Sequence, residues 1–326
     1  MRKGRALILG AGAVVVALSL IALVAFLPAS APPQRVEKSR ASAIPTDAVK
    51  WTPSMDEHPP ILHSDEFQGP IPVPGPINTA GAEDSPFILP DGSSLYFFFT
   101  PDVRKAPEEQ LMDGVSGIWR SDWNGSAWSE PVRVWLQDAG KLALDGAAFV
   151  GGGEIWFASA REGYEGVNLF IATEDGEGWK DWRFAGEQLN EQYQAGEMHI
   201  TSDGGRIYFH SSRPGGSGGL DIWYCDRSLD GWQQPVLVEE VSSIDNEGWP
   251  FVSQDGSELW FTRTHMGSPG IFRSLWNGSA WGAPELMVST LAGEPTLDQE
   301  GNLYFVHHYY QGMTMVEADI YVCYRN

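Results

Sequence analysis

The sequence predicts an all-β fold, a five-bladed β-propeller closed by an N-terminal strand in its last blade and preceded by one transmembrane helix. Three observations predict this fold. The chain of 326 residues contains 37 Gly and 22 Pro, which favours many tight turns over long helices. A hairpin motif recurs five times along the chain. The strand that the last repeat lacks occurs ahead of the first repeat.

Composition and charge limit the classes of partner. A hydrophobic fraction of 42%, with 14 Trp, is enough for a core and excludes general disorder. The net charge is −22, although the first 50 residues carry seven basic and only two acidic side chains. The rest of the chain is therefore strongly acidic and repels phosphate backbones, so we expect no nucleic-acid partner. Such a body suits cationic ligands or metal ions, or keeps an exported domain soluble.

The first 27 residues predict a signal anchor. Basic residues precede an uncharged, mostly apolar run from Ala6 to Leu27, which is long enough to span a bilayer as a helix. The basic flank places the N-terminus in the cytoplasm and the body outside, as a single-pass protein of the cell membrane. Cleavage after Ala31 is the alternative and would give a secreted protein, but Pro32 and the length of the apolar run favour the anchor. Residues 28–56, rich in Pro, Ala and Ser, predict a flexible tether.

Residues 57–326 carry the repeat. Asp-Gly between two apolar runs is a strong hairpin signal, because both residues tolerate positive φ. Three copies of the motif are close, and two are weaker. The close copies are Asp91–Phe97, Asp203–Phe209 and Asp255–Phe261, and the weaker ones are Gly152–Phe157 and Glu300–Phe305.

Further strands complete each repeat. A short strand follows every copy: Gly117–Trp119, Asn168–Phe170, Asp221–Trp223, Gly270–Phe272 and Asp319–Tyr321. A Trp with a Pro three residues later then marks a fourth strand after copies one, three and four. The sequence ends at Asn326 before the fifth copy can have this strand, and a matching piece, Phe67–Val73, stands at the other end. Five small sheets arranged radially would bury their aromatic faces, and Phe67–Val73 would close the ring.

The third copy has the clearest resemblance to a known family. It reads Ile-Thr-Ser-Asp-Gly-Gly-Arg-Ile-Tyr-Phe-His-Ser-Ser-Arg-Pro-Gly-Gly-Ser-Gly-Gly-Leu-Asp-Ile-Trp over residues 200–223 and resembles the TolB-type, or WD-like, propeller repeat. The resemblance covers nearly the whole body and implies the propeller fold. It leaves the function open, because the family includes binding modules, scaffolds and a few enzymes.

Acidic candidates emerge when the repeats are aligned on Pro86 and its counterparts at the start of the innermost strand. One residue before this anchor stand Ser85, Asp145, Glu197, Trp249 and Glu294. Three residues before it stand Glu83, Ala143, Ala195, Glu247 and Ala292. Each blade thus supplies one carboxylate. Since positions two apart on a strand share a face, we expect the five acids to point together near the mouth of the central channel.

Two interpretations of this acidic ring are open. The carboxylates could bind a cation through their oxygens, or acquire raised pKa values for acid–base chemistry. Alternatively, each accepts hydrogen bonds from backbone amides or Arg and fixes its blade to the next. The resemblance to TolB-type repeats, which commonly carry an acid here, implies the structural role. No cofactor is expected beyond such a cation.

Basic and histidine candidates lie just beyond the central strands. They are Arg161, Arg213, Arg263 with His265, and His307-His308-Tyr309. Arg beside aromatics could bind carboxylated or sugar ligands, and the glycine-rich loop 215–219 could bring backbone close to a ligand. Equally, Arg213 could pair with Asp221 or a ring acid in its own blade. His199 and His210 are expected to be structural.

Several searches exclude common chemistries. The sequence has no nucleophile elbow, phosphate-binding loop, dinucleotide fingerprint or zinc-ligand spacing. Cys225 and Cys323 fall in blades three and five, which are not neighbours, so we expect both to be buried and unbridged. We therefore predict a non-catalytic binding module for a protein, peptide or glycan. The alternative is a glycoside hydrolase-like enzyme that uses carboxylates in the central funnel.

Overall fold

The computed structural model describes residues 38–176, 178–190 and 196–326. The predicted signal anchor, residues 1–27, lies outside this range. Within it, no helix is both long and apolar enough to cross a membrane. The helices found there are short: α1 (Arg40–Ala43), α2 (Pro107–Asp113), α3 (Glu187–Asn190) and a 3-10 turn at Glu239–Val241. The chain is mostly β-structure, as predicted.

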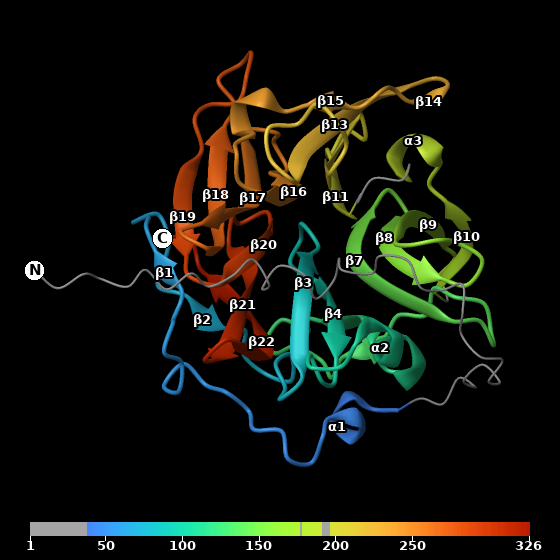
Figure 1. Cartoon of the computed structure of the whole chain (residues 1–326), viewed down its shortest axis with the longest axis vertical. Coiled ribbons are helices and arrows are strands. Elements are labelled where there is room, and N and C mark those ends of the chain that lie inside the picture. Colours follow the sequence, from blue (N-terminus) through green and yellow to red (C-terminus); the bar gives the residue numbers. More distant parts are fainter. Residues whose placement is uncertain (1–37, 177, 191–195) are drawn as a thin grey trace, which may run out of the picture.

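The strands form antiparallel units that follow one another along the chain (Figure 1). The first unit contains β3 (Ala82–Ile88), β4 (Ser94–Thr100), β5 (Gly117–Asp122) and β6 (Val132–Arg133). The second contains β7 (Ala143–Gly151), β8 (Glu154–Arg161), β9 (Asn168–Glu174) and β10 (Trp179–Phe184). The third contains β11 (Gly196–Ile200), β12 (Arg206–Ser211), β13 (Asp221–Ser228), β14 (Gly231–Trp232) and β15 (Val236–Leu237).

The last two units include strands from the N-terminal side. The fourth contains β16 (Glu247–Val252), β17 (Glu258–His265), β18 (Ser268–Leu275) and β19 (Glu285–Ser289), with β1 (Ile61–Leu62) paired to β19. The fifth contains β20 (Ala292–Leu297), β21 (Leu303–Gln311) and β22 (Thr314–Cys323), with β2 (Ile71–Pro72) paired to β22. A parallel pair, Ala318 with Ala82, joins the fifth and first units into one sheet.

The first strand of each unit lies toward the centre of the molecule (Figure 1). β3 contacts β7, β7 contacts β11, β11 contacts β16, β16 contacts β20, and β20 contacts β3 again. The inner strands therefore surround a common axis, and any site on that axis is built from all the units.

The predicted pairing between the two ends of the repeat region is confirmed. Ile71 pairs with Val322 and Pro72 with Tyr321, both antiparallel. A further bridge joins Phe67 to Arg325. Phe67–Val73 thus lies beside β22 and supplies the edge strand that the C-terminal sequence lacks.

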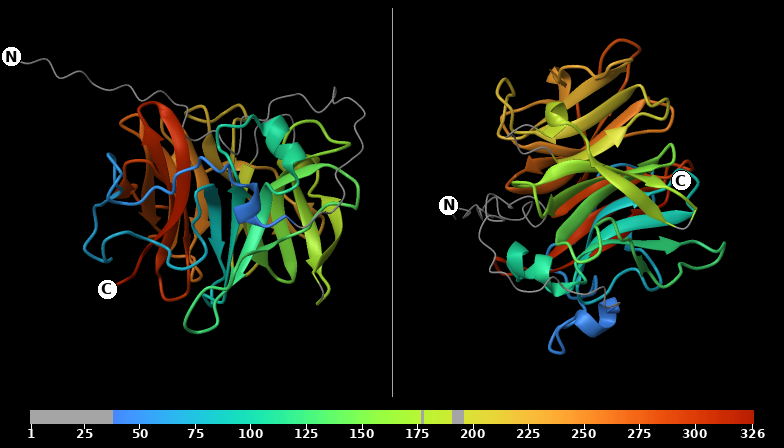
Figure 2. Two further views of the ribbon diagram at one scale, coloured as in Figure 1. Left: turned by 90° about the horizontal axis from the view of Figure 1, so that it is seen from below. Right: turned by 90° about the vertical axis from the view of Figure 1, so that its right-hand side faces the viewer.

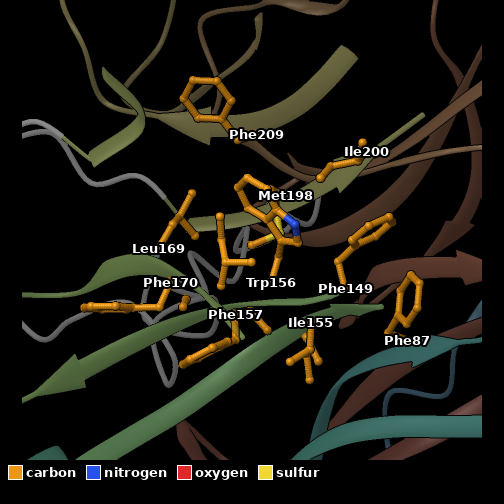
Figure 3. Close-up of a cluster of buried hydrophobic side chains, with 14 of the residues drawn as sticks. Phe87, Phe149, Ile155, Trp156, Phe157, Leu169, Phe170, Met198, Ile200 and Phe209 are labelled. Atoms are coloured by element: carbon orange, nitrogen blue, oxygen red, sulfur yellow. The ribbon is translucent and has the colours of Figure 1, made fainter. Parts of the chain in front are cut away.

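The repeat motif forms the core because the side chains on both faces of its strand are buried. The last Phe of each copy is fully buried: Phe97, Phe157, Phe209, Phe261 and Phe305. Neighbouring units pack through such residues. Figure 3 shows Trp156 and Leu169 of the second unit against Met198 and Ile200 of the third. Burial of each large apolar side chain contributes about 1.5–3 kcal/mol. Cys225 and Cys323 are buried and unbridged, as predicted.

The N-terminal segment differs from the flexible tether expected over residues 28–56. From residue 38 onward it packs against the β-units, and Figure 2 (left) shows it in blue crossing the red strands of the fifth unit. The guanidinium of Arg40 is buried beside Glu83, and the ammonium of Lys50 lies 2.5 Å from Asp319. Composition predicted flexibility, but these long-range charge pairs, which composition does not reveal, fix the segment.

Candidate functional site

Every inner strand contains a β-bulge at the same place. The register shifts between Asp84 and Phe87, Gly146 and Phe149, Gly196 and Met198, Gly248 and Phe251, and Gly293 and Thr296. Four of the bulges hold a non-glycine residue with left-handed backbone: Ser85 (φ 47°), Ala147 (φ 53°), Trp249 (φ 54°) and Glu294 (φ 58°). Such a conformation costs about 1–2 kcal/mol per residue. Strain of this kind clusters at functional sites, which makes the axis a candidate site.

The bulges correct the expected arrangement of the acids. Because a bulge adds a residue to one strand, positions two apart no longer share a face. Glu197 and Glu294 lie in the bulges, whereas Glu83, Asp145 and Glu247 precede them. The alignment of the second repeat was also wrong by two residues, since its bulge holds Ala147 and not Asp145. The five acids therefore form two separate groups.

The first group of acids pairs with arginine. Arg161 Nη2 lies 2.8 Å from Asp145 Oδ1, and Arg263 Nε donates to Glu247 Oε1 at 2.7 Å. Glu83 takes the same role with Arg40, at 3.0 Å. Burial raises the pKa of Glu83 to about 7, although Arg40 opposes the shift. The structure thus shows these three acids accepting hydrogen bonds from arginine, which is the arrangement that the structural interpretation expects.

The second group meets on the axis. Ser85 Oγ donates to Glu197 Oε1 at 2.7 Å, and the Ser85 backbone N–H donates to Glu294 Oε2 at 2.8 Å. Burial raises the pKa of Glu197 to about 8, with a further contribution from the charge of Asp84. The pKa of Glu294 is raised well above its usual value by burial and by the charges of Asp84 and Glu197. Asp84, which the repeat alignment passed over, thus belongs to this group.

The space around this axial acid group is small. Ser85, Glu197, Trp249 and Glu294 line a cavity of about 30 Å³. A cavity of that size holds one or two water molecules and no sugar ring. The acids can therefore share protons with each other and with water, but no larger molecule fits between them.

A much larger cavity opens at the other end of the inner strands, where the Asp-Gly turns lie. Its volume is about 1260 Å³, and every unit contributes to its lining. Phe87, Phe149, His199 and Phe251 form an aromatic floor, with ring centroids 5.2 Å apart for Phe87–Phe149 and 4.4 Å for His199–Phe251. The wide opening therefore lies at the opposite end of the inner strands from the predicted acid ring, and its floor is aromatic.

His199 is the floor residue that sequence reasoning treated as structural. Its Nδ1 accepts the Val252 backbone N–H at 3.2 Å, and burial lowers its pKa to about 3. The ring is therefore neutral at physiological pH, and the proton must be on Nε2. No hydrogen bond to Nε2 is found among the described residues. A comparison of the repeats could have identified His199 as a floor residue. It pairs with Tyr208 in the third unit as Phe87 pairs with Tyr96 in the first, so a histidine stands where the first unit has a phenylalanine.

The rim of the large cavity is acidic. Asp91, Asp203 and Asp255 each accept hydrogen bonds from residues of their own turn, and these bonds lower the pKa of each carboxyl. All three are therefore ionised at neutral pH. Arg227 and Arg325 also line the cavity. The mouth is thus polar and mostly negative above an apolar floor.

The other basic and histidine candidates lie away from this cavity. Arg161, Arg213 and Arg263 are held over the Phe residues of their own units, with the guanidinium carbon 5.0, 4.9 and 5.4 Å from the ring centroids of Phe157, Phe209 and Phe261. His307 Nε2 contacts Asp56 Oδ2 of the N-terminal segment at 2.8 Å. The structure brings none of these four residues to the large cavity.

The glycine-rich loop also has a structural explanation. Backbone N–H groups of Ser217 and Gly218 donate to Asp221 Oδ2 at 3.0 and 3.1 Å. A Cβ on Gly216 would lie 2.0 Å from that carboxylate oxygen. The glycines let the loop wrap around Asp221. Across the ranges described, no group of three or more His, Cys, Asp or Glu side chains is arranged to hold a metal ion.

Comparisons with known proteins add structural likenesses. No protein-family model and no curated protein matches the chain. Solved structures resemble it at low identity: an endo-arabinase of Bacteroides thetaiotaomicron (14% identity, 77% of this chain and 96% of that one, TM-score 0.48) and a gluconolactonase of Xanthomonas campestris (12%, 91% and 98%, 0.48). TolB of Acinetobacter baumannii matches over 76% of this chain and 55% of its own length (13%, 0.42). At these identities and scores, the likenesses assign neither a family nor an activity.

Proposed function

We propose that the units are the blades of a closed five-bladed propeller and that the protein is a membrane-tethered, extracytoplasmic binding module. Support for the closed ring comes from the contact of β20 with β3 and from the β2–β22 pairing. The tether and the location rest on the apolar run before Pro28 and its basic flank. The first 27 residues would anchor the protein in the membrane.

The single observation that carries this proposal is the large cavity at the Asp-Gly turns. At about 1260 Å³ it exceeds the usual range for a small-molecule pocket, about 300–1000 Å³. It therefore suits a segment of a larger partner. Aromatic side chains on the floor offer apolar contact, and His199 Nε2–H offers one hydrogen bond to an acceptor of the ligand.

The chemistry of the rim favours a positively charged peptide or protein segment. Ionised Asp91, Asp203 and Asp255 attract Lys and Arg side chains, and the whole body adds a long-range negative field. A glycan is the second ligand class, because sugar hydroxyl groups can donate to the same carboxylates.

The test is a titration of the full-length chain in detergent micelles by isothermal calorimetry. The peptides titrated are octalysine and octaglutamate. A glycan array, run as a separate binding assay, tests the second ligand class. We expect octalysine to bind, and the Asp203→Asn/Asp255→Asn variant to bind it at least about tenfold more weakly, since each lost rim charge removes attraction. Asp230→Asn, an exposed turn residue outside the cavity, is the matched control. Equal affinity of both variants, or no binding of any probe, would contradict the proposal.

An enzymatic function is the second candidate, because Glu197 and Glu294 have raised pKa values, as acid–base catalysts do. Glycosidase carboxylates flank a sugar in an open site. Here the acids enclose about 30 Å³, so a substrate would require the aromatic floor to open. A screen for glycoside hydrolysis, with Glu197→Gln and Glu294→Gln as controls, separates the candidates. Activity that both substitutions abolish would favour the enzyme.

A further inference from the structure

One buried cation site recurs on the units, and it is best seen in the fourth. Arg263 donates to Glu247 Oε1 and, through Nη2, to the Val241 carbonyl at 2.7 Å. Its guanidinium carbon lies 5.4 Å from the ring centroid of Phe261. The Ser243 backbone N–H donates to the other carboxylate oxygen of Glu247 at 3.0 Å. Charge, hydrogen bonds and an aromatic face together hold the guanidinium.

The first unit has the same site but no arginine of its own to fill it. Glu83 stands where Glu247 stands in the fourth unit, and Phe97 corresponds to Phe261. The strand after Phe97 continues Phe98-Phe99-Thr100-Pro101, without a basic residue. A buried carboxylate facing aromatic rings without a cation would be costly.

Arg40 of the N-terminal segment fills this site. Its Nη1 donates to Glu83 Oε1 at 3.0 Å and to the Ile77 carbonyl at 2.7 Å. Ile77 precedes Glu83 by six residues, as Val241 precedes Glu247. The Thr79 N–H donates to Glu83 Oε2 at 2.8 Å, which matches the bond from Ser243. The guanidinium carbon of Arg40 lies 5.4 Å from the ring centroids of both Phe97 and Phe99. Arg40 and Arg263 therefore share three kinds of partner: the carboxylate, the carbonyl six residues before it and the Phe ring, while Arg40 also donates to the Pro76 carbonyl at 2.5 Å.

The fifth unit receives its cation from the same segment. Its inner strand carries Ala292 where the first unit has Glu83, and its acid is Asp319 on β22. Lys50 Nζ contacts both Asp319 and Glu317, each at 2.5 Å. The Trp51 N–H also donates to Glu317 Oε2 at 2.9 Å. Near the end of the segment, the Asp56 carboxylate lies 2.8 Å from His307 Nε2 of the fifth unit.

We propose that residues 38–58 are a strap: an intramolecular peptide ligand that supplies the cations missing from the fifth and first units and holds these two units together. They are the units at which the two ends of the repeat region meet, so the strap reinforces the seam closed by β2. The proposal does not depend on the ligand of the large cavity, which none of these contacts touches.

The experiment is limited trypsin digestion of the native full-length chain in detergent micelles, with cleavage sites identified by mass spectrometry. Exposed Arg104 and Lys105 on the loop before α2 are the internal reference. In the wild type we expect cleavage after Arg104 or Lys105 well before cleavage after Lys50. Arg40→Ala should speed cleavage after Lys50 by about tenfold or more, because a protease samples the opened strap.

Two further variants keep the test decisive if Arg40→Ala folds poorly. Arg40→Lys retains the charge but loses the second guanidinium nitrogen, Nη2, which donates to the Pro76 carbonyl, so it should give an intermediate rate. Arg104→Ala, which breaks only an exposed pair with Asp102, should leave cleavage after Lys50 unchanged. The proposal is overturned if Lys50 is cut as fast as Lys105 in the wild type, or if neither Arg40 variant changes the rate.

Discussion

Glu197 of the third unit and Glu294 of the fifth accept hydrogen bonds from one residue, Ser85 of the first, at 2.7 and 2.8 Å. Three units therefore meet on the axis through two carboxyl groups in a cavity of about 30 Å³. Two like charges that close together in a buried site are unfavourable, so at least one carboxyl should hold a proton at neutral pH. This relationship gives the fold a specific dependence on pH.

We expect the free energy of unfolding to rise as the pH is lowered from about 8 to about 5. The folded-state pKa values of Glu197, at about 8, and Glu83, at about 7, lie above the usual 4.5 of a glutamate. In that window the folded state binds more protons than the unfolded state, so stability falls as pH increases. Urea denaturation at several pH values, followed by Trp fluorescence, measures this slope.

Glu197→Gln should flatten that slope, because the neutral amide needs no proton. Glu240→Gln, at an exposed position, is the control and should leave the slope unchanged. A slope of the opposite sign, or one that Glu197→Gln does not alter, would contradict the raised pKa.

Arg161→Ala should destabilise the protein by about 3–5 kcal/mol. It leaves Asp145, which is fully buried, without its cation, and a broken buried pair costs about that much. Arg183→Ala in the same unit is the control, since Arg183 pairs with Glu154 at the surface and such pairs contribute at most about 1 kcal/mol. Chemical denaturation of the two variants compares them. If both variants lose the same free energy of unfolding, the buried pair stabilises the protein no more than the surface pair does, which would contradict the prediction.

Ala147→Gly should be neutral or stabilise the protein by up to about 1 kcal/mol. Glycine removes the left-handed strain at φ 53°, which offsets its larger entropy loss on folding. Ala148→Gly, one residue further in the same bulge, has no such strain to relieve and should cost about 0.5–1 kcal/mol. The difference between their unfolding free energies is the measured quantity. If both substitutions cost the same, the bulge stores no strain.

The sequence was sufficient to predict a mostly β structure, because the repeat contains the signals of its hairpins. The Asp-Gly turns and the Leu-Tyr-Phe strands predicted the hairpins, and the missing fourth strand predicted the pairing of Phe67–Val73 with β22. These are local patterns, and their consequences for burial follow from strand alternation. The bulges could not be predicted in this way, since no residue type marks them in all five repeats, and they divided the acids into two groups.

The site was predicted less well, because its parts come from distant segments. Composition predicted a flexible tether over residues 28–56. Nothing in the composition indicated that Arg40 would pair with Glu83, 43 residues later in the chain, and so replace the arginine that the first unit lacks. The large cavity was missed for another reason. Three of its floor residues, Phe87, Phe149 and Phe251, have the sequence pattern of ordinary core residues. The fourth, His199, stands where the first repeat has Phe87, and this difference between the repeats could have identified it.

The central proposal is that Phe67–Val73, which pairs with β22, completes the fifth unit and thereby closes a ring of five units. Native-state hydrogen exchange of the full-length chain, read by mass spectrometry, tests it most directly. The account predicts that residues 67–74 are protected, because Gln68 and Val73 donate to the carbonyls of Tyr324 and Ile320 at 2.8 Å, and that Phe67→Ala speeds exchange in 67–74 and in β22 together. Fast exchange of 67–74 beside a fully protected β22 would contradict it.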